Sequence, residues 1–152
     1  AGCKEILNHQ HTDFDTIACS VGTGGTLAGL IESAQPHQEV VGFSALRNAN
    51  LPQEIKKWTK MKNWSINSNY TFGGYAKVSV ELIQFINTFN KNFKTPLDPV
   101  YTGKLLFGIF DLIKNRQWHS DKKILIIHTG GLQGIEGMNQ KLTQKKWPKI
   151  IV

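Results

Sequence analysis

Apolar residues along this chain follow two patterns that alternate from one end to the other. Continuous apolar runs, short enough to be buried strands, occupy residues 15–21, 39–44 and 124–127. Between them, apolar positions recur every three or four residues, which predicts helices at 25–34, 50–61, 78–89 and 101–116. The pattern also predicts a short helix over residues 2–10 and an irregular or strand-like stretch over 64–72. Strands that alternate with helices indicate an α/β fold in three layers around a mainly parallel sheet.

The turn after the first predicted strand is rich in glycine and threonine. It consists of Gly22, Thr23, Gly24, Gly25 and Thr26. A glycine turn at a helix N-terminus offers unpaired backbone amides and the positive end of the helix dipole, which favour a phosphate. The common nucleotide loops fit poorly, because no lysine follows Gly25 and Leu27 stands where the dinucleotide fingerprint has glycine or alanine. The turn therefore favours a cofactor with one phosphate, and a tight turn without a ligand stays open as the alternative.

A second glycine turn follows the last predicted strand and leads into a short predicted helix. It is formed by His128, Thr129, Gly130 and Gly131. Ligands of open parallel sheets bind beyond the carboxyl ends of the strands, so we expect both turns at one rim of the sheet. His128 is expected to be a hydrogen-bonded histidine at a strand end. Asp98 lies in a rigid, proline-flanked loop, and we expect it to cap the helix that begins near Tyr101.

Composition narrows the range of functions. A length of 152 residues fits one domain, and no apolar run approaches the roughly 20 residues that cross a membrane. The net charge is +7, but the lysines are scattered in short clusters, so we expect solvated faces and no nucleic-acid partner. Cys3 and Cys19 lack metal-ligand spacing and are expected to be reduced, which predicts a cytoplasmic protein. We expect neither a metal site nor membrane association.

Four segments, in this order, resemble one known family. They are Ser20–Gly29, Phe72–Tyr75, Pro96–Lys104 and Ile127–Gly131. Together they are similar to the C-terminal part of the 1-aminocyclopropane-1-carboxylate deaminase and D-cysteine desulfhydrase family. The resemblance implies a pyridoxal 5′-phosphate enzyme of the tryptophan-synthase-β-like fold (fold type II) that acts on a small amino acid. It implies that residues 1–140 are the C-terminal part of the cofactor-binding large domain and that 141–152 are a basic tail.

The resemblance also implies roles for particular residues. The turn from Gly22 to Thr26 would hold the cofactor phosphate. Tyr75 and Tyr101 match the two active-site tyrosines, with Tyr101 against the pyridine ring, where a phenol of lowered pKa would act as nucleophile or base. Taken singly, each tyrosine is also explained as a residue of the core or its rim.

Two threonines bear on the choice of substrate. Family members that open the cyclopropane ring carry glutamate after the catalytic tyrosine and tend to have leucine in the second glycine turn. This chain has Thr102 and Thr129 at those places. A threonine hydroxyl at the pyridine nitrogen gives a weaker electron sink than a carboxylate, which favours β-elimination from D-cysteine. We therefore expect a desulfhydrase-like enzyme, with 1-aminocyclopropane-1-carboxylate deaminase or a non-catalytic phosphate-binding module as alternatives.

One part that such an enzyme needs has no match in this sequence. The Schiff-base lysine of the family lies in its N-terminal region, and neither Lys4, Lys77 nor Lys104 stands in that context. We therefore expect the chain to be part of a longer polypeptide and to be inactive alone. Its expected partners are the missing N-terminal segment, the amino-acid substrate and, from the resemblance, a second copy in a homodimer.

Overall fold

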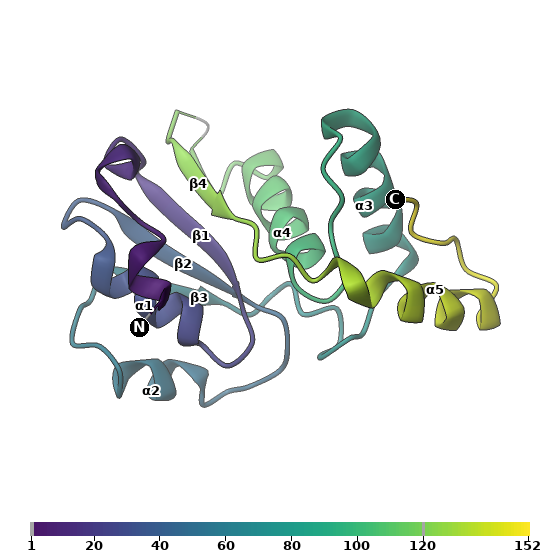
Figure 1. Ribbon diagram of the computed structural model, residues 1–152, viewed down its shortest axis with the longest axis horizontal. Helices are drawn as coiled ribbons and strands as arrows, with labels where there is room; N and C mark the ends of the chain where they lie inside the picture. Colours follow the sequence, from purple (N-terminus) through teal and green to yellow (C-terminus); the bar gives the residue numbers. More distant parts are fainter. Residues whose placement is uncertain (1, 120) are drawn as a thin grey trace.

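The computed structural model describes residues 2–119 and 121–152. Ala1 and Ser120, both inside the predicted 1–140 unit, lie outside the described residues. The described residues form a four-stranded parallel sheet in the order β3-β2-β1-β4 (Figure 1). Its strands are β1 (Thr16–Val21), β2 (Glu39–Ser44), β3 (Trp64–Asn67) and β4 (Ile124–Ile127). The predicted α/β fold with a parallel sheet is confirmed.

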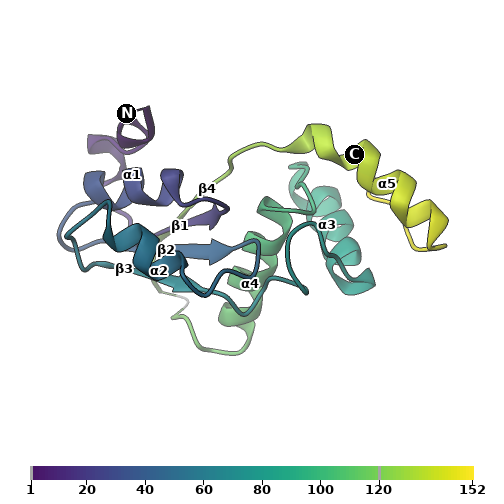
Figure 2. The ribbon, with the colours of Figure 1, turned by 90° about the horizontal axis from the view of Figure 1, so that it is seen from below.

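Helices cover both faces of this sheet and give the predicted three layers. One face packs against α1 (Gly25–Ser33) and α2 (Leu51–Lys56), and the other against α4 (Thr102–Lys114). The helix α3 (Val80–Phe93) packs on α4 and lies farther from the sheet (Figures 1 and 2). Because both faces are covered, the sequences of β1, β2 and β4 are mainly apolar, whereas the edge strand β3 is not.

Alternation along β1 shows how the two cores divide. Ile17, Cys19 and Val21 are buried with α1 and α2, whereas Ala18 is buried with α4. On β2, Phe43 joins the α4 side, where its ring lies 5.8 Å from that of Trp118. Successive side chains of a strand point to opposite faces, so a single apolar run supplies both cores.

The ends of the helices follow local chemistry. Ser79 precedes α3, and its hydroxyl accepts a hydrogen bond of 3.1 Å from the backbone N–H of Leu82. The predicted helix over residues 2–10 is wrong, because the chain forms two 3₁₀ turns, η1 (Gly2–Glu5) and η2 (His9–His11). The Asn8 side chain accepts from the N–H of Gln10 and so starts a new turn.

The C-terminal segment packs on the body of the protein. A 3₁₀ turn, η3 (Leu132–Gly134), leads into α5 (Ile135–Gln144), so the predicted boundary between residues 140 and 141 falls inside a helix. Leu142 and Ile150 are buried in the core that contains α3 and α4. The Asn139 side chain donates to the C=O of Ile150 at 2.9 Å and accepts from its N–H at 2.8 Å.

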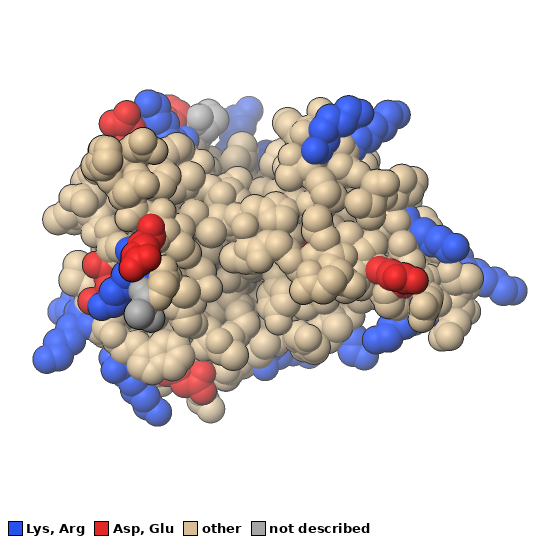
Figure 3. Space-filling model, in the orientation of Figure 1, with Lys and Arg blue, Asp and Glu red and all other residues tan. Residues whose placement is uncertain are grey.

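The surface agrees with the scattered charges of the sequence. Lysines and arginines lie mainly around the edge of the face shown in Figure 3, and few charged side chains occupy its middle. Across residues 2–119 and 121–152, no helix combines the length and the apolar character that a membrane span requires.

Candidate functional site

The strand order places a binding crevice next to β1. The chain runs from β1 through β2 to β3 in one direction and then returns to add β4 on the other side of β1. Where the order reverses in an open parallel sheet, the loops at the carboxyl ends of the two strands on either side of the reversal separate and leave room for a ligand. In this chain those loops are the two glycine turns, 22–25 and 128–131.

A cavity of about 840 Å³ lies at this rim and brings together most of the predicted site residues. Both glycine turns and both tyrosines reach its wall. The predicted residues that line it are Gly22, Thr23, Thr26, Tyr75, Tyr101 and Thr129. The remaining lining residues are Ser20, Leu46, Asn48, Glu54, Trp58, Gly130, Gly131 and Gln133. The expectation that both turns open on one side of the sheet is confirmed.

The first glycine turn has the backbone that its sequence suggests. Gly24 is buried and has φ of +100°, a backbone conformation that residues with a side chain rarely adopt. A Cβ on Gly24 would lie 2.5 Å from Cδ1 of Ile55. Gly24 is also the N-cap of α1 and supplies no side-chain hydrogen bond to the helix. The amides of the first turn of α1 are therefore left for a ligand at the positive end of the helix dipole.

Tyr101 lies directly against this turn. A Cβ on Gly22 would be 3.3 Å from Cε1 of Tyr101, so a larger residue at that position would crowd the ring. Tyr75 is 60% exposed, and its ring centroid lies 6.4 Å from that of Tyr101 at an interplanar angle of 64°. The two phenols therefore share one edge of the cavity.

The expected lowering of the Tyr101 pKa is wrong for this chain. Burial raises the pKa of Tyr101, and the neighbouring Tyr75 phenol and the charge of Asp98 raise it further. The groups that act on this phenol are acidic or apolar, and each of them opposes a phenolate.

Asp98 organises the start of α4 and accepts hydrogen bonds from both the backbone and the side chain of Thr102. One carboxylate oxygen of Asp98 accepts from the N–H groups of Val100 and Tyr101, both at 2.8 Å. The other accepts from the N–H of Thr102 at 2.8 Å and from its hydroxyl at 2.7 Å. The predicted cap is confirmed. Thr102 is only 1% exposed and does not line the cavity, although the resemblance implied that its hydroxyl lies at the cofactor.

His128 fixes the second glycine turn, as expected for a strand-end histidine. Its Nδ1 accepts from the N–H of Gly130 at 3.1 Å, which leaves Nε2 to donate to the C=O of Pro96 at 3.0 Å. Gly131 sits against Asp98, since a Cβ on it would lie 3.1 Å from the Asp98 carboxyl carbon. The second turn is thus held against the loop that precedes α4.

Sequence reasoning missed the wall contributed by the region after β2. Glu54 of α2 and Trp58, just beyond it, face the cavity, and the Asn48 side chain donates to Glu54 at 3.4 Å. Trp58 also approaches Gly24, whose Cβ would lie 3.5 Å from its ring. The available signal was the position of this loop, because it follows the carboxyl end of a strand next to β1.

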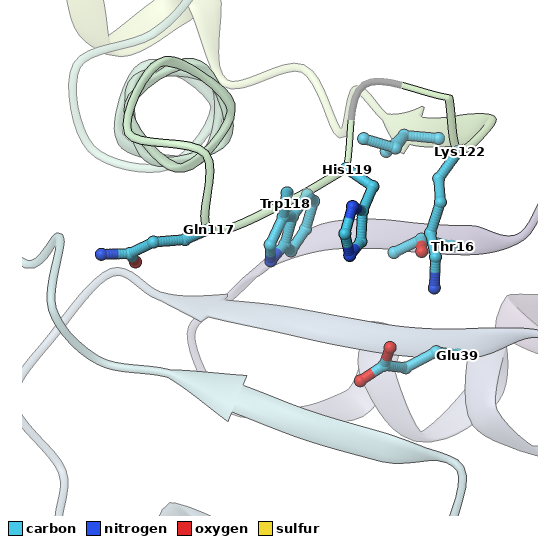
Figure 4. A pocket seen from close by; sticks show the side chains of 7 residues that line it. Thr16, Glu39, Gln117, Trp118, His119 and Lys122 are labelled. Atoms are coloured by element: carbon cyan, nitrogen blue, oxygen red, sulfur yellow. The ribbon is translucent and has the colours of Figure 1, made fainter.

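A second cavity lies at the opposite end of the sheet. It has a volume of about 240 Å³ and is lined by Thr16, Glu39, Gln117, Trp118, His119, Lys122 and Ile124 (Figure 4). Thr16, Glu39 and Ile124 are the first residues of their strands, so this cavity is at the amino ends, away from the glycine turns. Within the described residues, no cluster of three or more histidine, cysteine or acidic side chains could hold a metal ion.

The chain is similar to curated proteins over most of its length, although no family model matches it. It is 34% identical over 151 residues to a putative 1-aminocyclopropane-1-carboxylate deaminase of Pyrococcus horikoshii, covering 91% of this chain and 46% of that protein. Identity is 32% over 154 residues to the putative deaminase of Thermotoga maritima, covering 91% and 47%. The chain thus spans about half the length of the curated relatives it matches.

Two solved structures share the fold. A crystal structure of an ACC deaminase homologue matches with a TM-score of 0.69 and 32% identity, covering 93% of this chain and 47% of that one. The processed form of threonine deaminase isoform 2 from Solanum lycopersicum matches with a TM-score of 0.53 and 13% identity, covering 93% and 45%, which shows a shared fold alone. The predicted resemblance to the C-terminal part of the deaminase family, and the predicted fold class, are confirmed.

Proposed function

Because this chain resembles the C-terminal part of the putative 1-aminocyclopropane-1-carboxylate deaminases over nine-tenths of its length, we propose that it is the cofactor-phosphate-binding part of a pyridoxal 5′-phosphate enzyme. The enzyme would be a lyase or deaminase of a small amino acid. The observation that carries the proposal is the convergence of two glycine turns and two tyrosines on one cavity.

The first glycine turn fits the phosphate end of the cofactor. The helix α1 begins behind a glycine N-cap, and Thr23 and Thr26 bring hydroxyl groups to the same wall. Free amides, hydroxyls and the helix dipole would together bind a phosphate dianion. When bound, pyridoxal 5′-phosphate supplies an electron sink for bonds at the α-carbon of an amino acid.

The tyrosines are the groups of this chain suited to hold or move a proton. The raised pKa keeps the Tyr101 phenol protonated at neutral pH, so it would serve as a hydrogen-bond donor in this state. β-Elimination from D-cysteine removes the proton on Cα and breaks the Cβ–S bond, and the departing sulfide then takes up a proton. A neutral phenol at the cavity edge is suited to donate a hydrogen bond to the departing sulfur.

The lysine that links the cofactor would come from outside this chain. None of the described residues that line the cavity is a lysine. Lys104 is buried and binds backbone carbonyl groups, and Lys77 is exposed in the loop after Tyr75. We propose that residues corresponding to the other half of the relatives' length supply the lysine, and that this chain alone is inactive.

D-Cysteine is the substrate that we propose first. Thr129 lines the cavity, and position 102 carries no carboxylate to keep a pyridine nitrogen protonated. A weaker electron sink suits a substrate with a good leaving group on Cβ, as in D-cysteine, better than the opening of a cyclopropane ring. Because the Thr102 hydroxyl is engaged by Asp98, this preference rests on Thr129 and on the missing carboxylate.

Binding of the phosphate group can be tested on the isolated chain. Amide NMR signals of residues 22–26 should shift on addition of pyridoxal 5′-phosphate or inorganic phosphate, and pyridoxal without phosphate should leave them unchanged. The variant Gly25→Asp should abolish the shifts, because it adds a negative charge at the start of α1. A Cβ on Gly25 meets no atom within 4 Å, so the variant should keep the fold.

The matched control is Gly137→Asp, which adds the same charge in the first turn of α5 and has equally free space around its Cβ. It should bind phosphate like the parent chain. Shifts that survive Gly25→Asp, or that appear away from residues 22–26, would contradict the proposed phosphate site.

Catalysis needs a second experiment, because a non-catalytic phosphate-binding module would pass the first. A polypeptide that contains this chain together with the cofactor-linking lysine should release sulfide, pyruvate and ammonia from D-cysteine. Ammonia from 1-aminocyclopropane-1-carboxylate, without activity on D-cysteine, would instead indicate the ring-opening branch. No turnover of either compound by the cofactor-loaded polypeptide would favour the binding module.

A further inference from the structure

Lys104 is a buried amine for which the proposed chemistry has no use. It lies in the first turn of α4, three residues after Tyr101, and is 1% exposed. Its Nζ donates to three backbone carbonyl oxygens: Thr71 at 2.8 Å, Gly74 at 2.9 Å and Ala45 at 3.2 Å. Three acceptors around one nitrogen use all three N–H groups of an ammonium, whereas a neutral amine has two.

The carbonyl groups belong to segments that form the rim of the candidate site. Ala45 directly follows β2, at the carboxyl end of that strand. Thr71 and Gly74 belong to the loop that carries Tyr75. The Lys104 side chain therefore joins the helix start next to Tyr101 with the loop of the second tyrosine.

The loop that carries Tyr75 has an unusual backbone. Phe72, Gly73, Gly74 and Ala76 all have positive φ, at 54°, 104°, 130° and 55°. Two of these residues carry a side chain, and such residues adopt this conformation only where surrounding contacts impose it. Inside the loop, the N–H of Gly74 donates to Thr71 and that of Lys77 donates to Gly74. The Lys104 ammonium binds the same two carbonyl groups and so fixes both turns.

We propose that Lys104 is a positioning residue for the candidate site, because its ammonium clamps the Tyr75 loop to α4 and thereby sets the separation of the two tyrosines. The inference rests on the proposed function only in taking Tyr75 as a residue of the active site. The negative charge of Asp98, in the loop before α4, favours the charged form of Lys104 and so raises its pKa. Of the titratable side chains on or beside the contacting loops, Arg47, Tyr75 and Lys77 are exposed. Tyr70, next to Thr71, is half-buried and donates to the Asp111 carboxylate at 2.7 Å.

The test uses the isolated chain at pH 7 without cofactor, so its outcome is independent of the proposed function. In the parent chain, NMR should show ring-proton contacts between Tyr75 and Tyr101, whose centroids are 6.4 Å apart. The variant Lys104→Met should lose those contacts and keep the contact between Tyr101 and Gly22. Lys114→Met, at the other end of α4, is the matched control and should keep both.

Limited digestion with trypsin gives a second measurement. Lys77 is an exposed cleavage site in the Tyr75 loop, and Lys62, in the segment between α2 and β3, is an exposed internal reference. In Lys104→Met, cleavage at Lys77 relative to Lys62 should rise at least tenfold. The loop loses its two hydrogen bonds to the ammonium, and the loss of even one hydrogen bond to a charged donor changes the loop's opening equilibrium by about that factor. Lys104→Arg retains the charge and donors and should recover part of the protection.

An unchanged tyrosine contact together with unchanged cleavage at Lys77 in Lys104→Met would overturn the proposal. If that variant does not fold, the parent chain still decides the question. The Lys104 ammonium protons should exchange slowly with water at pH 7 and show couplings to the carbonyl carbons of Thr71 and Gly74. Fast exchange, like that of the exposed Lys114, would equally overturn it.

Discussion

Removal of the Asp98 carboxylate should destabilise the chain more than the removal of any other single carboxylate among the described residues. Asp98 is 1% exposed and accepts four hydrogen bonds of 2.7–2.8 Å at the start of α4. Hydrogen bonds to a charged group contribute about 1.5–3 kcal/mol each, but they are not additive here because they share one carboxylate. For Asp98→Ala we therefore expect a loss of about 3–5 kcal/mol, the range for breaking a buried charged network.

Asp98→Asn separates geometry from charge. The asparagine oxygen can serve one pair of donors, but its NH₂ group then faces the other pair, which includes a backbone N–H in either orientation. We expect a loss of about 2 kcal/mol, intermediate between the parent chain and Asp98→Ala. The exposed Asp13→Ala is the control and should change stability by less than about 0.5 kcal/mol.

Urea unfolding followed by far-ultraviolet circular dichroism measures these differences, and thermal unfolding offers a check. A loss of 3–5 kcal/mol in a chain of this size corresponds to a fall in Tm of roughly 6–20 °C. If Asp98→Ala loses less than about 1 kcal/mol, or if Asp98→Asn is the less stable of the two, the four hydrogen bonds do not stabilise the helix start as described.

Three further predictions concern protonation, backbone and thiol reactivity. Burial lowers the pKa of Lys104 from 10.5 to about 8, so above pH 8 the unfolded chain holds a proton that the folded chain has lost. From pH 8 to 10 the unfolding free energy of the parent chain should therefore rise relative to that of Lys104→Met, and a parallel or falling profile would contradict this. Gly24→Ala should cost about 1–3 kcal/mol in urea unfolding, and Gly25→Ala should not. A thiol reagent at pH 8 should leave Cys19 unmodified in the folded chain, since burial raises the pKa of its thiol to about 12. Mass spectrometry of the digested chain measures this, and a labelled Cys19 peptide would contradict it.

The sequence predicts best where a local pattern and the global fold agree. The strand at Thr16–Val21 and the glycine turn after it are read from neighbouring residues alone, and the structure has both. The cap by Asp98 also follows from local spacing. The position of Thr102 does not, because whether its hydroxyl faces the cavity or the protein interior depends on the path of the whole loop before α4.

Other features depend on contacts between distant segments. The order of the elements places the loop after β2 at the rim, but which side chains form the wall, here Glu54 and Trp58, depends on how α2 packs there. The resemblance implied a lowered pKa for Tyr101 as a phenol against the pyridine ring of the cofactor. Its actual surroundings are Tyr75, Asp98 and buried surface, and all three raise it.

The segment from Pro96 to Lys104 explains why such a motif is more specific than a glycine turn alone. Asp98 packs against Gly131 of the second turn, and Tyr101 packs against Gly22 of the first. Lys104 binds the loop that carries the other tyrosine. One short segment thus contacts both glycine turns and the Tyr75 loop, so a substitution in it should affect several walls of the cavity. A lone glycine turn needs to fit only the helix that it begins, and similar turns therefore occur in proteins with unrelated functions.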